Sequence, residues 1–269
     1  MGANTKLLRS RIKSVDSTLH LTKAMGLVAS SKIRRANEAM LKSRQYADAV
    51  TNAVSMLTAS PETAKSPYLA VRDEGRTRLI VIAGDRGLAG GYNANIFRLV
   101  ASLPKAEYIA IGKRACDRFG CAVNSSEDYT SAEARELAAT LCEDFANGKF
   151  DRLGIACTEY HSMMTQTAVV RWVLPLERGE QPQGGAGIVF EPDEQTILPV
   201  AVLEYVSGVL MAAVRESFAS EVAARRMAMD SAGKNAQEMI AELQLQYNRA
   251  RQGAITQEIT EIVAGSGEQ

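Results

Sequence analysis

The chain has 269 residues, of which 46% are hydrophobic and 23% are charged, and its formal net charge is zero. This composition is typical of a soluble protein with one large domain, or with a modest domain and an extension. No apolar run approaches the roughly 20 residues that span a bilayer, and residues 1–10 lack the order of a signal peptide. These criteria exclude direct membrane insertion and secretion, so we expect a chain kept in the cytosol.

The N-terminal part predicts one long helix. From Leu8 to Leu57, apolar or small residues recur in alternating steps of three and four, interrupted only by Thr22, Gly26 and Ser43. A mean spacing of 3.5 residues predicts left-handed supercoiling around another helix, and the prolines that follow residue 60 end the helix. We expect residues 1–60 to pair antiparallel with a second helix of the same chain rather than with a second copy.

The first helix also carries a basic face. Residues 1–44 contain ten Lys or Arg and two Asp or Glu. Such a face could bind nucleic acid, but no aromatic residue precedes Tyr46 and no nucleic-acid motif is present. A solvated or protein-facing surface is therefore the preferred interpretation, and no nucleic-acid partner is expected.

Between residues 76 and 176 the periodicity changes to that of an α/β domain. Apolar runs at 78–83, 108–111, 152–157 and 168–176 predict strands, and helices are predicted at 93–101, 113–119 and 131–147. Strands that alternate with helices predict a small parallel, Rossmann-like sheet. Residues 177–199, with prolines and the cluster Gly184–Gly187, predict a flexible linker.

Residues 200–269 predict a second long helix, running to about residue 264 over roughly 95 Å. Its seam comprises Ala236, Ile240, Leu243, Tyr247, Ala250 and Ala254. No compact domain of this size is that wide. The helix must therefore project from the body and be stabilised by another long helix or by a partner's cavity.

The end of this helix is both acidic and apolar. Residues 252–269 contain no Lys or Arg but include Glu258, Glu261 and Glu268, and carboxylates at a helix C-terminus oppose the macrodipole. The apolar set is Ile255, Ile259, Ile262 and Val263. Because a frayed end would leave these side chains in water, we expect partner subunits to enclose the tip.

The residues provide little support for catalysis or cofactor binding. The loop Gly84–Asn93 follows a strand and opens a helix, but it matches neither GxGxxG nor GxxxxGK[ST], so a structural turn packed against the long helices is favoured over a nucleotide site. Four cysteines lack CxxC spacing and two histidines lack a Ser or Cys and acid constellation. We expect no catalytic residues, no cofactor and no metal, with free buried thiols.

Three segments resemble the gamma subunit family of F-type ATP synthases. The first is Arg9–Thr18 with Leu21–Met25 and Val28–Ala36, which is similar to the family's opening helix. The second is the loop Asp85–Asn93. The third is Glu216–Glu221 with Ala224 and Arg225, followed by Tyr247–Gln252 and Ile255–Val263, which are similar to its closing helix.

The resemblance implies a non-catalytic central stalk. An antiparallel coiled coil would rotate inside a hexamer of alpha and beta subunits and couple the transport of hydrogen or sodium ions to ATP synthesis or hydrolysis, at the cytoplasmic face of the bacterial plasma membrane. By the same comparison, Met25, Arg225, Gln252, Thr256 and Glu258 would meet the beta subunits' catch loops. The foot around Asp85–Asn93, including Arg86 and Gly87, would lie near the membrane c-ring and the epsilon subunit.

Several positions depart from the family pattern. Gly26, Gly233 and Gly253 stand inside helices, where each costs about 1 kcal/mol relative to Ala. Arg226 stands where an apolar residue is common, and Cys116 and Cys121 do not form the chloroplast-type dithiol segment. Two other functions stay open: a scaffold whose basic face binds an acidic partner, and a dinucleotide enzyme stabilised by NAD.

Overall fold

The structure is a computed structural model that describes residues 2–72, 75–120, 125–179 and 190–266. These residues form two compact units. The coiled-coil unit contains residues 1–30 and 226–269, and the α/β unit contains residues 31–225. The long helices α1 (Gly2–Ala59) and α5 (Glu194–Ser266) contribute to both units. Cys121 and the cluster Gly184–Gly187 lie outside the described residues.

The coiled-coil unit has the predicted antiparallel seam. On α1, Leu19, Thr22, Gly26 and Ala29 are buried. On α5, Ala236 and Leu243 are buried, and the other four predicted seam positions are half-buried. The backbone of Gly233 lies beside Thr22 and Leu19, whereas that of Gly26 lies beside Met229. Because positions rise along one helix as they fall along the other, the pairing is antiparallel.

Helix α5 begins at Glu194, six residues before the predicted start at residue 200. Asp193 caps it, because the Thr196 backbone N donates to the Asp193 carboxylate at 2.8 Å and the Thr196 hydroxyl donates at the same distance. These hydrogen bonds hold the pKa of Asp193 below its ordinary value. Pro199 was predicted to end a linker, but it lies inside the early turns of α5.

The sheet of the α/β unit is mixed, and the expectation of an all-parallel sheet was wrong. Its strands are β1 (Thr77–Ile82), β2 (Glu107–Ile111), β3 (Arg152–Tyr160) and β4 (Gln166–Leu174), in the order β2-β1-β3-β4. β1 runs parallel to β2 and β3, whereas β3 and β4 are antiparallel. Only a short turn joins β3 to β4, and a parallel pair would need a crossover of a dozen or more residues.

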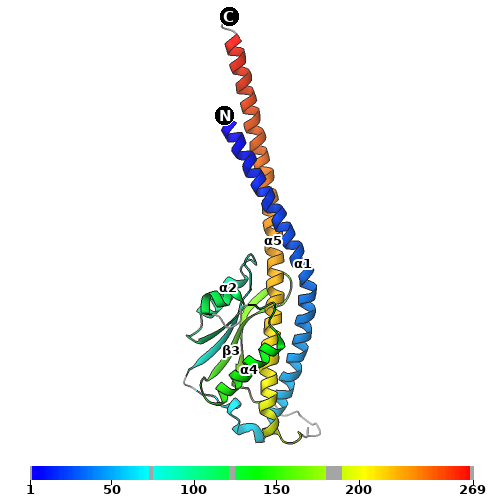
Figure 1. The fold of residues 1–269 in the computed structure, drawn as a ribbon, viewed down its shortest axis with the longest axis vertical. Coiled ribbons are helices and arrows are strands. Elements are labelled where there is room, and N and C mark those ends of the chain that lie inside the picture. The colour runs from blue at the N-terminus through cyan, green and yellow to red at the C-terminus, as the bar shows by residue number, and fades with distance from the viewer. Residues whose placement is uncertain (1, 73–74, 121–124, 180–189, 267–269) are drawn as a thin grey trace. The chain divides into compact units, whose positions relative to one another are not determined.

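Helices cover both faces of this sheet (Figure 1). Alternate residues of β1 point to opposite sides: Leu79 and Val81 pack with α2 (Tyr92–Ala101) and α3 (Lys113–Phe119), whereas Ile80 and Ile82 pack with α4 (Ser131–Ala146) and α5. All four of these side chains are buried, which explains why β1 reads as an unbroken apolar run.

Helix α5 is a core helix of the α/β unit. The expectation that no apolar run is long enough to span a bilayer was wrong, because by length and composition this helix could cross a membrane; half of its most apolar stretch is buried inside the protein. Leu198, Val202, Val206 and Leu210 are at most 1% exposed and join the core with α4 and the sheet. These four apolar side chains therefore belong to the core of the domain.

The α1 residues of the α/β unit pack on the outside of α5 (Figure 1). Ala36 and Met40 form a cluster with Ala219, and Val54 and Leu57 join the main core. After α1, two short 3₁₀ helices follow, η1 (Pro61–Lys65) and η2 (Pro67–Leu69), each begun by a serine cap. Cys142 and Cys157 are buried free thiols, as expected, and the Cys116 side chain is half-buried.

Candidate partner interface

The loop between β1 and α2 is closed by its own side chains. The Gly84 backbone N donates to Asn93 Oδ1 at 2.9 Å, and Asn93 Nδ2 donates to the Arg86 carbonyl at 3.4 Å. The Tyr92 hydroxyl donates to the Ser217 carbonyl of α5 at 3.0 Å. Burial raises the pKa of Tyr92, so its hydroxyl remains a neutral donor. This confirms the prediction of a structural turn packed against a long helix.

Asp85 anchors this loop to two other connections. Its carboxylate accepts from the backbone N of Ser126 at 2.9 Å, of Glu127 at 3.0 Å and of Lys113 at 3.2 Å, and from the Ser125 hydroxyl at 3.0 Å. These donors occupy both carboxylate oxygens. The side chain of Asp85 therefore orders the unit's own loops.

Glu221 and Arg225 of α5 contact the same loop. The Arg225 guanidinium pairs with the Glu221 carboxylate and donates to the Gly87 and Arg86 carbonyls, each at 3.4 Å. Glu221 is 2% exposed, and burial raises its pKa although Arg225 acts in the opposite direction. The resemblance assigned Arg225 and Gly87 to different partners, but the structure places them in contact.

The outer surface of the loop consists of Arg86 and Leu88. Both side chains are exposed, and Leu88 is 64% exposed. Leu88 also has a φ of 61°, the left-handed region that costs a non-glycine residue about 1 kcal/mol or more. An exposed apolar side chain on strained backbone marks this loop as a candidate contact surface.

In the coiled-coil unit, Met25 is half-buried next to a close helix contact. Arg226 donates through Nη1 to the carbonyl of Gly26 at 3.2 Å. A Cβ at position 26 would lie 3.3 Å from that nitrogen. Gly26 and Arg226 thus form one polar contact between α1 and α5, at a position where the family commonly has an apolar residue in place of Arg226.

The C-terminal part of α5 presents Gln252, Thr256 and Glu258 as exposed side chains. The Thr256 hydroxyl donates to the Gln252 carbonyl at 3.0 Å, within the helix. The apolar side chains of the same segment are also exposed: Ile255 by 45%, Ile259 by 56%, Ile262 by 70% and Val263 by 63%. The segment therefore combines a polar and an apolar surface that the coiled-coil unit itself leaves uncovered.

Glu216, which sequence reasoning gave no role, joins α1, α5 and the sheet. It is 3% exposed and accepts from Arg44 Nη2 at 2.6 Å, Arg171 Nη2 at 2.8 Å and the Tyr160 backbone N at 3.0 Å. Arg171 also pairs with Glu159 at 2.9 Å. Buried carboxylates with several donors are costly to disrupt, so this network fixes α1 against the α/β unit.

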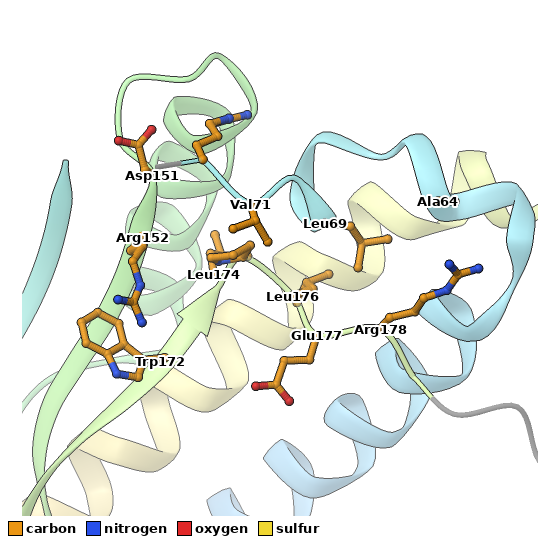
Figure 2. A pocket seen from close by; sticks show the side chains of 12 residues that line it. Ala64, Leu69, Val71, Asp151, Arg152, Trp172, Leu174, Leu176, Glu177 and Arg178 are labelled. Carbon is orange, nitrogen blue, oxygen red and sulfur yellow. The ribbon is translucent and has the colours of Figure 1, made fainter. Parts of the chain in front are cut away.

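A pocket of about 680 Å³ is lined by residues of η1, η2, the start of β3, the end of β4 and the segment after β4 (Figure 2). Leu69, Val71, Leu174 and Leu176 form its apolar part. The Arg152 guanidinium lies 4.1 Å from the centre of the Trp172 ring, and Arg178 and Glu177 follow on the segment after β4. Within the described ranges, no group of three His, Cys, Asp or Glu side chains could hold a metal ion.

Comparison with known proteins identifies the family. The pattern of the ATP synthase family matches residues 4–267. The ATP synthase gamma chain of Psychrobacter cryohalolentis is 35% identical, over 98% of both chains. The sodium ion specific gamma chain of Acetobacterium woodii is 36% identical, over 99% of both. The chain belongs to the ATP synthase gamma chain family.

Solved structures of this family share the fold. A chain in the rotor of the Euglena gracilis mitochondrial ATP synthase superposes with a TM-score of 0.65 at 18% identity, over 95% of this chain and all of that one. A chain of the Tetrahymena thermophila mitochondrial central stalk and c-ring has a TM-score of 0.59, over 79% of this chain. Gamma chains are central-stalk subunits, distinct from the catalytic subunits.

Proposed function

We propose that this chain is the rotor of a bacterial ATP synthase and turns inside a hexamer of alpha and beta subunits. The observation that carries the proposal is the full-length similarity to gamma chains, combined with a coiled coil whose C-terminal end exposes an apolar surface. Rotation would couple ion flow through a membrane ring to ATP synthesis, and hydrolysis would reverse it. The complex would lie on the cytoplasmic face of the plasma membrane.

The mechanism follows from asymmetry. A helix pair has no threefold symmetry, so it presents a different surface to each of three equivalent catalytic sites. A contact can shift a conformational equilibrium only by its differential free energy for the two states, and unequal contacts satisfy that condition. Rotation then permutes the three states. The side chains proposed to make these contacts are Met25, Arg225, Gln252, Thr256 and Glu258.

The contact between Arg225 and Gly87 supports a change in the assignment of the loop. Arg225 lies far along α5 from the start of that helix. Gln195 stands at the start, and Arg225 follows thirty positions later, roughly 45 Å along the helix. Because the loop lies beside Arg225, we assign Asp85–Gly87 to the same partner as Arg225, namely the beta subunits.

The ring and the epsilon subunit are then assigned to the opposite end of the α/β unit. That end contains η1, η2 and the segment after β4, and Gln195 Nε2 donates to the Glu62 carbonyl there at 3.2 Å. Val71 is 78% exposed beside the pocket of Figure 2, which also contains three arginines. An exposed apolar residue among cations suits a protein contact.

The test is purification of the tagged chain from its native membranes in mild detergent, with intact mass and ATPase assay. We expect one copy of the chain together with alpha, beta, epsilon and c subunits and nucleotide hydrolysis. A second preparation lacks residues 255–269 and should lose coupled ATP synthesis, because the exposed apolar end of α5 is removed. Recovery of the full chain alone, without ATPase subunits, would contradict the proposal.

A further inference from the structure

We propose that Glu221 and Arg225 are positioning residues that hold the β1–α2 loop in the conformation that projects Arg86 and Leu88. The inference rests on the proposed function, because it assigns the projected side chains to contact with a partner subunit of the rotor. It adds a role for Glu221 and Gly84, and it gives Arg225 an internal role in addition to the partner contact proposed for it above.

The space around Gly84 is the first step of the argument. A Cβ built at position 84 would lie 2.7 Å from Glu221 Cδ and 2.8 Å from its Oε1. A side-chain Cβ is not found that close to another heavy atom, so any residue other than glycine at position 84 would require the Glu221 carboxylate to move. The start of the loop is thus fitted to Glu221.

Arg225 supplies the second step. Its side chain is 14% exposed, and its guanidinium is directed at the Glu221 carboxylate and at the carbonyls of Arg86 and Gly87. A planar guanidinium with five N–H donors can serve a carboxylate and two carbonyls at once. Glu221 therefore orients Arg225, and Arg225 holds the middle of the loop.

The strain at Leu88 supplies the third step. A leucine with a φ of 61° leaves that conformation unless its surroundings hold it there. Asp85 and Asn93 fix the two ends of the loop, and Arg225 contacts the residue immediately before Leu88. Without the Arg225 contact, we expect Leu88 to relax and its side chain to leave its outward position.

The experiment uses the complete ATP synthase complex with four versions of this chain: wild type, Glu221→Gln, the double variant Glu221→Gln with Arg225→Met, and Asp230→Asn. The last variant is the matched control, because it removes an exposed ion pair with Lys234 four residues away on the same helix. Three quantities are measured: thermal stability, hydrogen exchange of amides 85–91, and ions pumped per ATP hydrolysed.

We expect Glu221→Gln to lower thermal stability, since it leaves a largely buried guanidinium without its carboxylate. Exchange of the loop amides should accelerate at least about tenfold, and the ions pumped per ATP should fall. The double variant removes both charges and should recover thermal stability. Its loop exchange should stay fast and its pumping low, because the contact with Gly87 is still missing.

The outcomes separate three cases. If pumping recovers with stability in the double variant, the pair only stabilises the fold and the positioning role is overturned. If loop exchange accelerates while pumping stays at the wild-type value in both the Glu221→Gln variant and the double variant, the role is overturned as well. If wild type and Asp230→Asn fail to pump ions at all, the proposed rotor function itself fails.

Discussion

Asp151 illustrates how one buried carboxylate sets the pH dependence of the α/β unit. It is fully buried and accepts from the Arg76 backbone N at 2.9 Å and from its guanidinium at 3.1 and 3.2 Å. These hydrogen bonds hold the pKa of Asp151 below its ordinary value. The ionised group therefore stabilises the fold above about pH 4, and this contribution is lost as the pH falls through the lowered pKa.

We predict that Asp151→Asn weakens this acid sensitivity. The wild-type free energy of unfolding should fall as the pH is lowered below about 4, and the variant should be less stable at neutral pH but show a shallower decline. Urea unfolding at several pH values can be followed by the fluorescence of Trp172, the only tryptophan in the sequence. The exposed Asp48→Asn serves as the control. An unchanged pH profile in Asp151→Asn would contradict the assignment.

The three helix glycines should differ in their response to alanine. Nothing lies within 4 Å of a Cβ at Gly253, and at Gly233 the neighbours are at ordinary distances of 3.7 and 3.9 Å. Alanine at either position should raise helix stability by up to about 1 kcal/mol. Gly26→Ala should gain less, because the new methyl would lie 3.3 Å from Arg226 Nη1 and disturb its hydrogen bond.

Thermal melting of the purified chain, followed by far-UV circular dichroism, checks this series. The order of midpoints should place Gly233→Ala and Gly253→Ala above wild type, with Gly26→Ala below both. An equal rise for all three would mean that the Arg226 contact does not restrain the helix pair.

At the scale of elements, the periodic segments were predictable and the pairing of strands was not. Every seam position from Leu8 to Leu57 is buried or half-buried, because a repeat of 3.5 residues has only one face to bury. The antiparallel β4 was missed because direction is set by the length of the connection, which residues 161–165 provide, and not by side-chain pattern. The early start of α5 depended on one cap, Asp193.

The seam of α1 can be tested with two alanines that stand two residues apart. Ala47 is 7% exposed and Ala49 is exposed. Ala47→Leu inserts a larger side chain into a close helix contact and should lower the free energy of unfolding by about 1 to 3 kcal/mol. Ala49→Leu should change it by less than about 0.5 kcal/mol. Urea unfolding of the two variants measures the difference, and equal effects would contradict the seam.

At the scale of the whole molecule, the sequence was sufficient to identify the family, but it did not predict which of the family's positions contact one another. Arg225, Asp85 and Gly87 were recognised as family positions, yet their mutual contacts depend on Glu221 and Gly84, which lie more than a hundred residues apart in the chain. No local pattern predicts such a contact. The spacing of residues predicted which side chains share a face of α5, but it did not predict that this helix contacts the loop between β1 and α2.

Rotation is the central claim, and one measurement tests it most directly. An alpha and beta hexamer assembled with this chain is fixed to a surface, and a bead is attached to a cysteine introduced at the exposed Lys105 after Cys116 and Cys121 are replaced by serine. On addition of ATP, we predict stepwise rotation of the bead in one direction at a rate that tracks hydrolysis. Steady hydrolysis with a stationary or randomly moving bead would contradict the account.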